Sequence, residues 1–266
     1  MYPVLFKIPV LGGITIYSYG LMVALGFVAA IFWVAFESRR LGQNPAKAMD
    51  LIFCVIIAGI VGSRILHVAI SERERFLSDP LMIFRIWEGG LVFYGGLVAA
   101  IVVAIWFIRR NGMPMLLTMD IFAPAVALGH AVGRIGCFLA GCCYGRQCSP
   151  DAWYRVVFPT GSRSFAPTGV PLYPTQLMEV AGELAIFAVL VFISRRKRFE
   201  GQVITTYLML YAVLRSFNEL FRGDSERGFL IEGWLSTSQF IALILFAAGA
   251  AVYVWKWRRR EKGEGR

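Results

Sequence analysis

Charged residues are scarce in this sequence. Lys, Arg, Asp and Glu together make up 17% of the 266 residues, whereas 58% are hydrophobic. A soluble domain is usually about one quarter charged. The sequence also lacks a clear linker, a low-complexity segment and a convincing internal repeat. The shortage of charge excludes a separate soluble domain, and we expect a single polytopic membrane domain over residues 1–266.

A secretory signal peptide is missing as well. Only Lys7 precedes the first apolar run, and no small-residue cleavage site follows it. A signal peptide would carry a basic n-region and such a site. We therefore expect the first run to be an uncleaved membrane span.

Long apolar runs are abundant. A spanning helix needs about 20 apolar residues, and seven runs approach or exceed that length. They lie at about 15–36, 50–70, 91–108, 119–140, 175–193, 202–222 and 236–257. This pattern predicts an all-α integral membrane protein with seven transmembrane helices.

The basic residues are distributed unevenly over the connections. Most follow the first, third and fifth runs or lie in the C-terminal tail, which are connections on one side of the membrane. The positive-inside rule then predicts a cytoplasmic C-terminus and an N-terminus outside. The loop 141–174 would form a small external head. Since the net charge of +10 is explained in this way, we expect contact with anionic membrane lipids and no nucleic-acid partner.

Three arginines, Arg64, Arg134 and Arg215, lie inside apolar runs or at their ends. An arginine near the bilayer centre costs about 3 kcal/mol on insertion scales and usually faces a cavity or a bundle interior. Arg215 and Glu219 are four residues apart and can pair on one helix face. The alternatives are an Arg64 that reaches the interface and an Arg215–Glu219 pair that only neutralises itself.

Two further stretches combine tyrosine with glycine. Tyr19 opens the first run, where it is either an inward hydrogen-bond donor or part of an aromatic belt. Tyr94 stands between the pairs Gly89–Gly90 and Gly95–Gly96. Because each glycine costs a helix up to about 1 kcal/mol relative to alanine, this stretch predicts a turn that brings the backbone close to a ligand. A simple entry into the third helix is the alternative.

Four cysteines, Cys137, Cys142, Cys143 and Cys148, cluster at and after the end of the fourth run, toward the outer side. Zinc sites usually space their ligands as C-x2-C. Since Cys142 and Cys143 are adjacent, we expect neither a metal nor any other cofactor. One disulfide is plausible, with a pairing that the spacing does not reveal. A membrane thiol redox protein is a rival interpretation, although the C-x-x-C spacing of such proteins is missing.

Several motifs, in the order in which they occur, resemble those of the prolipoprotein diacylglyceryl transferases of bacterial plasma membranes. Each is weak alone, but together they are specific and extend over nearly the whole chain. They are Tyr19-Gly20, Gly89-Gly90 to Gly95-Gly96, Gly133-Arg134-Ile135-Gly136 with Gly141 and Gly145-Arg146, Pro174-Thr175-Gln176-Leu177 with Glu179, and Arg215-x-x-x-Glu219 followed by Phe221-Arg222.

The resemblance implies transfer of the diacylglyceryl group of phosphatidylglycerol to the lipobox cysteine in the signal peptide of a prolipoprotein. A thioether forms and glycerol phosphate leaves. It also implies that Arg134 and Arg215 hold the headgroup, that Glu219 orients Arg215, and that Tyr94 donates a hydrogen bond or positions a phosphate. The expected substrate-binding residues are Tyr19, Arg64, Gly95, Gly96, Gly133, Cys137, Gly145, Gln176 and Glu179.

The chain departs from the family pattern at three positions. Tyr94 stands where the family often has histidine, Cys137 where it usually has asparagine, and Cys142 where it often has glutamate. Tyrosine, with a pKa of about 10, is a poor base at neutral pH. A paralogue that binds lipid or transfers it to another acceptor is therefore the alternative function.

Overall fold

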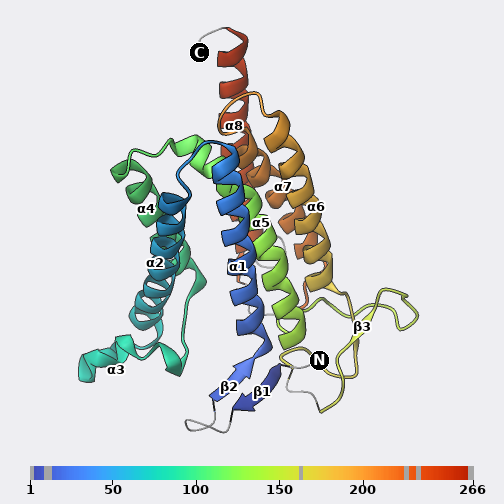
Figure 1. The fold of residues 1–266 in the computed structure, drawn as a ribbon. Coiled ribbons are helices and arrows are strands. Elements are labelled where there is room, and N and C mark those ends of the chain that lie inside the picture. Colours follow the sequence, from blue (N-terminus) through green and yellow to red (C-terminus); the bar gives the residue numbers. More distant parts are fainter. Residues whose placement is uncertain (1–2, 9–13, 162–163, 225–227, 232–234, 263–266) are drawn as a thin grey trace. The chain divides into compact units, whose positions relative to one another are not determined.

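The computed structural model describes residues 3–8, 14–161, 164–224, 228–231 and 235–262 (Figure 1). Arg266 of the basic tail and residues 162–163 of the expected head lie outside them. The long helices are α1 (Ser18–Arg40), α2 (Pro45–Ser71), α4 (Phe93–Arg110), α5 (Met115–Ala140), α6 (Thr175–Arg196), α7 (Gln202–Glu219) and α8 (Thr237–Glu261).

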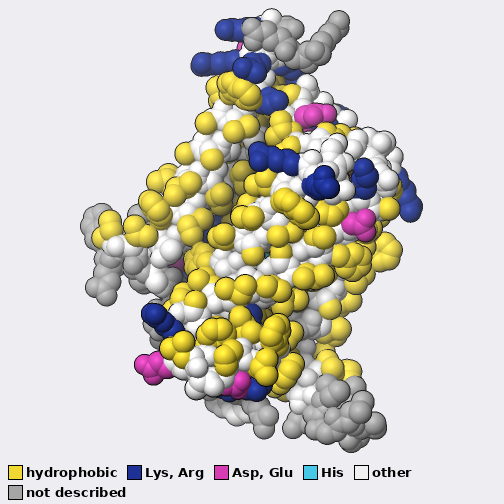
Figure 2. All heavy atoms as spheres, turned by 90° about the vertical axis from the view of Figure 1, so that its left-hand side faces the viewer, with side chains coloured by type: hydrophobic (Ala, Val, Ile, Leu, Met, Phe, Trp, Pro, Cys, Tyr) yellow, Lys and Arg dark blue, Asp and Glu magenta, His cyan; other side chains and the backbone are white. Residues whose placement is uncertain are grey.

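Six of these helices are long and apolar enough to cross a membrane, namely α1, α2, α4, α5, α6 and α8. The helix α7 lies where a sixth span is expected and has 18 residues, but it is not among those six. Hydrophobic side chains cover most of the surface seen in Figure 2. The chain is therefore a helical integral membrane protein with six candidate spans.

Short elements connect the helices. They are the helix α3 (Arg73–Ser78), the 3-10 turns η1 (Pro80–Phe84) and η2 (Ile86–Glu88), and three antiparallel strand pairs. The pairs are β1 (Val4–Ile8) with β2 (Ile14–Tyr17), β3 (Val156–Val157) with β4 (Pro171–Leu172), and β5 (Phe229–Ile231) with β6 (Leu235–Ser236). The sequence analysis predicted none of these strands, because two to five residues carry little periodicity.

The chain divides into two compact units, and α1 and α5 each have residues in both. The first unit comprises residues 1–33 and 119–266, and the second comprises 34–118. In the first unit α5, α6 and α7 share a buried cluster of Ala123, Ala127, Ile186, Leu190, Val203 and Tyr207. This packing fixes the three helices that carry most of the polar residues discussed below.

Asp120 on α5 fixes the start of α7. Its carboxylate accepts hydrogen bonds from the backbone N–H groups of Gly201, Val203 and Ile204 at 2.9 to 3.0 Å. The first N–H groups of a helix have no partner within the helix, and a carboxylate there also favours the helix dipole. At α8 the Ser236–Gln239 capping box satisfies the first N–H groups in a similar way.

In the second unit α2 and α4 approach closely through glycines. A Cβ atom on Gly95 would meet the backbone of Gly62, and one on Gly96 would meet Ser63 and the backbone of Gly59. Small residues allow this approach of membrane helices. In the described geometry Gly95 and Gly96 pack against α2, and their predicted contact with substrate stays a prediction.

Arg64 is almost completely buried in the same unit. Its guanidinium donates hydrogen bonds to the backbone carbonyls of Met82 (2.7 Å), Ile83 (3.2 Å) and Gly89 (2.6 Å), with a longer one to Gly90. Gly89 and Gly90 have positive φ, as the predicted turn requires. Arg64 therefore holds the loop before α4, and its predicted contact with substrate remains untested.

Replacing Arg64 by methionine should remove these bonds and leave buried carbonyls without donors. Each such group costs about 1–3 kcal/mol, so we expect an apparent free energy of unfolding in detergent that is lower by about 3 kcal/mol or more. Arg73→Met, at an exposed position of α3, is the control and should change it little. Equal stability of the two variants would contradict the role given to Arg64.

Candidate functional site

One face of α5 carries four residues of interest near the C-terminal end of the helix. His130, Gly133, Arg134 and Cys137 follow the spacing i, i+3, i+4, i+7, which places them on one side of the helix. No atom lies within 4 Å of a Cβ built on Gly133, so the helix has open space beside it there. The side chains of His130 and Arg134 both point toward carboxylates of α6.

Glu179 on α6 joins three helices. One of its oxygens accepts a hydrogen bond from the Arg134 Nη2 at 2.8 Å, and the other accepts one from the Asn218 Nδ2 of α7 at 2.7 Å. Glu179 is 1% exposed. A buried carboxylate of this kind is tolerated because a cation and a hydrogen-bond donor both satisfy it.

A second carboxylate, that of Glu183, lies one turn further along α6. His130 Nδ1 lies 2.8 Å from the Glu183 Oε1, and His130 Nε2 lies 3.6 Å from the Glu179 Oε1. The His130 ring also contacts the ring of Tyr211 on α7, with 5.7 Å between centroids. The imidazole therefore connects the two carboxylates of α6.

Arg215 on α7 is the second guanidinium of the site. Its Nη2 lies 2.8 Å from the Glu219 Oε2 and donates to the Ser238 Oγ at 3.1 Å. Its Nη1 is buried without a hydrogen-bond partner, as is the Nε of Arg134, among the residues that the structure describes. Buried polar atoms are nearly always bonded, and the Glu183 Oε2 and the Asn218 Oδ1 also lack a partner among the described residues. The site therefore has both donors and acceptors open to a polar ligand.

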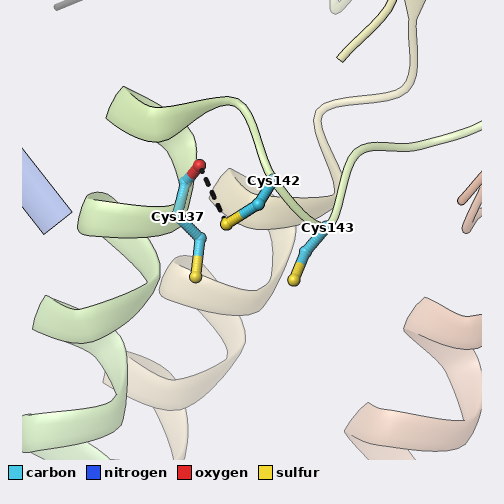
Figure 3. A group of neighbouring side chains, drawn as sticks. All are labelled: Cys137, Cys142 and Cys143. Atoms are coloured by element: carbon cyan, nitrogen blue, oxygen red, sulfur yellow. Dashed lines mark hydrogen bonds between the residues drawn. The ribbon is translucent and has the colours of Figure 1, made fainter. Parts of the chain in front are cut away.

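Cys137 near the end of α5 and the two cysteines after that helix, Cys142 and Cys143, form a compact group. Their sulfur atoms all lie within 4.8 Å of one another, and Figure 3 shows the Cys142 thiol directed at the carbonyl of Cys137, at 3.7 Å. The Arg134 Nη1 lies 3.9 Å from the Cys137 sulfur. All five cysteines of the chain are free, so the disulfide considered from the sequence is absent.

The start of α6 holds the cysteine turn in place. The Gln176 Nε2 donates to the carbonyl of Cys142 at 2.8 Å, and the Thr175 Oγ1 donates to that of Cys143 at 2.9 Å. Hydrogen bonds with Cys137 and Cys142 lower the pKa of the Cys143 thiol, whereas hydrogen bonds with Cys137 and Cys143 raise that of Cys142. Cys143 is therefore the thiol of the turn that ionises more readily.

Arg222 follows α7 and lies close to this turn. Gly145 forms a β-bridge with it, and its guanidinium makes two hydrogen bonds to Asp224. Burial lowers the pKa of Arg222, but the hydrogen bonds to Asp224 and the nearby negative charges together raise it by more, so the net shift of the pKa is upward. The residue stays charged, and it adds a third guanidinium near the cysteines.

Comparison with known proteins identifies the family. Residues 3–255 match the model of a family described as prolipoprotein diacylglyceryl transferase. The chain belongs to this family. It is 35% identical to the phosphatidylglycerol–prolipoprotein diacylglyceryl transferase 2 of Clostridium perfringens over 95% of this chain and 96% of the relative. Transferases with the same name, without the numeral, from Azotobacter vinelandii (95% and 94%) and Geobacter sulfurreducens (97% and 96%) are each 34% identical.

Family membership confirms the resemblance drawn from the motifs. Together with the six apolar helices it makes the chain a multi-pass protein of the bacterial inner membrane. The roles of individual residues are a separate question, which only the geometry addresses.

The first unit brings most of the predicted site residues together. Arg134, Glu179, Arg215 and Glu219 lie in the network described above, and Gln176 and Cys137 adjoin it. Of the remaining predicted residues of this unit, Gly133 has open space beside it, and Tyr19 and Gly145 pack against neighbouring residues. Tyr19 lies against Gly136, and Gly145 against Tyr173 and Thr175.

Tyr94, by contrast, belongs to the second unit together with Arg64, Gly95 and Gly96. It is 44% exposed near the start of α4, and its ring contacts that of Phe93. Its predicted role stays a prediction.

The sequence analysis assigned no role to His130, Glu183 and Asn218. Each could have been found by helical spacing from a residue that it did select. His130 is four residues before Arg134, Glu183 is four after Glu179, and Asn218 is three after Arg215.

Replacing Glu179 by leucine should leave Arg134 and Asn218 without their shared partner. Removing one member of a buried ion pair typically costs about 3–5 kcal/mol. We expect that loss in the free energy of unfolding, measured in detergent, and a smaller one for Glu179→Gln, which keeps a hydrogen-bonding oxygen.

Glu200→Leu, at an exposed position between α6 and α7, is the matched control and should be nearly neutral. If Glu179→Leu were as stable as Glu200→Leu, the three-helix network would not hold the first unit together.

Proposed function

We propose that the chain is a phosphatidylglycerol–prolipoprotein diacylglyceryl transferase. It transfers the diacylglyceryl group of phosphatidylglycerol to the thiol of the lipobox cysteine of a prolipoprotein, forms a thioether and releases glycerol phosphate. The relatives carry the name of this activity, and the chain matches them over nearly their whole length. The alternative from the sequence, a paralogue with another acceptor, is decided by the assay below.

The observation that carries the proposal within the site is the pair of unused buried donors on Arg134 and Arg215. When a thiolate displaces a phosphate ester at carbon, negative charge develops on the leaving phosphate oxygens. Guanidinium donors stabilise that charge best in a site that excludes water. The proposal gives both arginines the phosphate of the lipid headgroup as their ligand.

The charge balance of the site supports binding through hydrogen bonds. Arg134 pairs with Glu179 and Arg215 with Glu219, so each guanidinium is already neutralised. A phosphate bound there would gain directed N–H donors from the guanidinium groups.

The finer architecture is part of the same proposal. We infer that α7 completes seven spans, with the N-terminus outside and the C-terminus in the cytoplasm, and that the chain is one membrane domain. The segment 141–174 would be the external head; its small core of Phe158, Ala166 and Leu172 supports a compact unit. The site at the ends of α5 and α6 would then open on the outer side.

The transfer reaction tests the residue assignment directly. In membranes containing the chain, labelled diacylglyceryl from phosphatidylglycerol should appear on a lipobox peptide. Arg134→Gln or Arg215→Gln should each lower the rate by about 100-fold or more, since removing one such donor typically costs 10²–10³. Arg110→Gln, at the exposed end of α4, is the control and should retain the activity.

Full activity in both site variants would contradict the assignment, and an inactive wild type would contradict the function.

The sidedness of the same reaction tests the orientation. Right-side-out vesicles should modify an added membrane-impermeant peptide, and inside-out vesicles should not.

A further inference from the structure

The three-cysteine group is not explained by the binding of a lipid headgroup. Cys137 is buried and Cys142 and Cys143 are half-buried, yet their sulfurs lie within 4.8 Å of one another without a disulfide. Each thiol is a weak donor and a weak acceptor, so the hydrogen bonds among them are weak. As thiolates, three such cysteines are the ligand type that zinc prefers.

The backbone is arranged to bring these thiols together. Among the described residues Cys143 is the one non-glycine residue with a positive φ, of 57°. That conformation is uncommon outside glycine and carries strain, which a structure retains where a side chain must be aimed. Because of this turn, two adjacent cysteines direct their sulfurs to the same place as Cys137.

The turn is also anchored on both sides. The side chains of Gln176 and Thr175 hold the carbonyls of Cys142 and Cys143, so the peptide dipoles face α6. On the other side, a Cβ on Gly141 would clash with Ser164 and Phe158, which shows how closely the turn packs on the following segment. A preorganised set of three ligands on a fixed turn is what a metal site requires.

We propose that Cys137, Cys142 and Cys143 bind a zinc ion through three thiolates, and that the open fourth position takes the thiol of the acceptor cysteine. This inference rests on the transferase function proposed above. Catalytic zinc typically has three protein ligands and one open position. Zn–S bonds of about 2.3 Å in a tetrahedron place sulfurs about 3.8 Å apart, so sulfurs at most 4.8 Å apart need to close by no more than about 1 Å.

The zinc site supplies what the residues otherwise lack, a means to ionise the acceptor. A free thiol has a pKa of about 8.5 and is mostly protonated at neutral pH. On zinc the acceptor sulfur loses its proton, which passes to water. It then attacks the glyceryl carbon, an S–C bond forms, the C–O bond to phosphate breaks, and the electron pair leaves with the phosphate oxygen. No oxidant or reductant is required.

A guanidinium lies beside that charge. Zinc with three thiolates carries one negative charge, and the Arg134 Nη1 lies 3.9 Å from the Cys137 sulfur. Arg134 would thus contact both the metal ligand and the phosphate, which brings the nucleophile and the leaving group to the same guanidinium. Zinc is preferred to copper because thiolates bind both, whereas only zinc has no redox chemistry to oxidise the acceptor thiol.

Metal analysis of the purified full-length chain tests the site. In detergent and without chelators, we expect about one zinc per chain, and cobalt substitution should give the near-ultraviolet thiolate-to-cobalt charge-transfer band. Cys142→Ser and Cys143→Ser should lower zinc occupancy by 10-fold or more. Cys148→Ser, which removes a buried thiol outside the group, is the matched control and should keep it. Cys142→His supplies a different zinc ligand and should retain metal, which separates loss of binding from misfolding.

Four outcomes would overturn the inference: free thiols without metal, a disulfide within the group, copper in place of zinc, or zinc that Cys143→Ser leaves unchanged. The transfer assay keeps the two proposals apart. A wild type that transfers lipid but holds no zinc overturns the zinc site alone. A wild type that holds zinc through these cysteines but transfers nothing overturns the transferase function and, with it, the acceptor as fourth ligand.

Discussion

Glu179 is the residue on which the first unit depends most. A charged carboxylate at 1% exposure is stable only if donors meet both of its oxygens, and here they come from two other helices. Arg134 of α5 binds one oxygen and Asn218 of α7 binds the other. His130 and Cys137 lie about one turn from Arg134 on α5, and Arg215 lies about one turn from Asn218 on α7. The contacts of Glu179 therefore also help to position His130, Arg215 and the cysteine turn.

This arrangement contributes little to stability, which indicates that it serves binding. Buried ion pairs seldom add stability over apolar packing, and this site in addition leaves N–H groups of two arginines without partners. A loss of stability of this kind is typical of a binding site rather than of a packed core. A phosphate that accepts from both arginines would satisfy the unused donors, and a three-thiol group beside the same guanidinium would hold the attacking sulfur.

The helices and the arginines could be predicted from the sequence, but their partners only in part. Long apolar runs fix where helices lie, and an arginine inside such a run must be paired, so Arg134, Arg215 and Glu219 were found. Partners on other helices, such as Glu183 for His130, depend on helix rotation, which the runs do not determine. Arg64 shows the converse: its charge indicated a site, but its donors bind backbone carbonyls. The adjacent cysteines were expected to be poor metal ligands, and the positive φ at Cys143, which brings their sulfurs close to that of Cys137, has no signal in the sequence.

Lipid retention tests the central claim, that the network binds the headgroup phosphate, more directly than activity does. The chain would be exchanged into phosphatidylglycerol nanodiscs, extracted gently, and the lipid retained per chain read by native mass spectrometry. Wild type should retain phosphatidylglycerol, and the double variant Arg134→Gln/Arg215→Gln should retain at least about 10-fold less, since two charge-assisted hydrogen bonds are removed. Equal retention in both proteins would contradict the account.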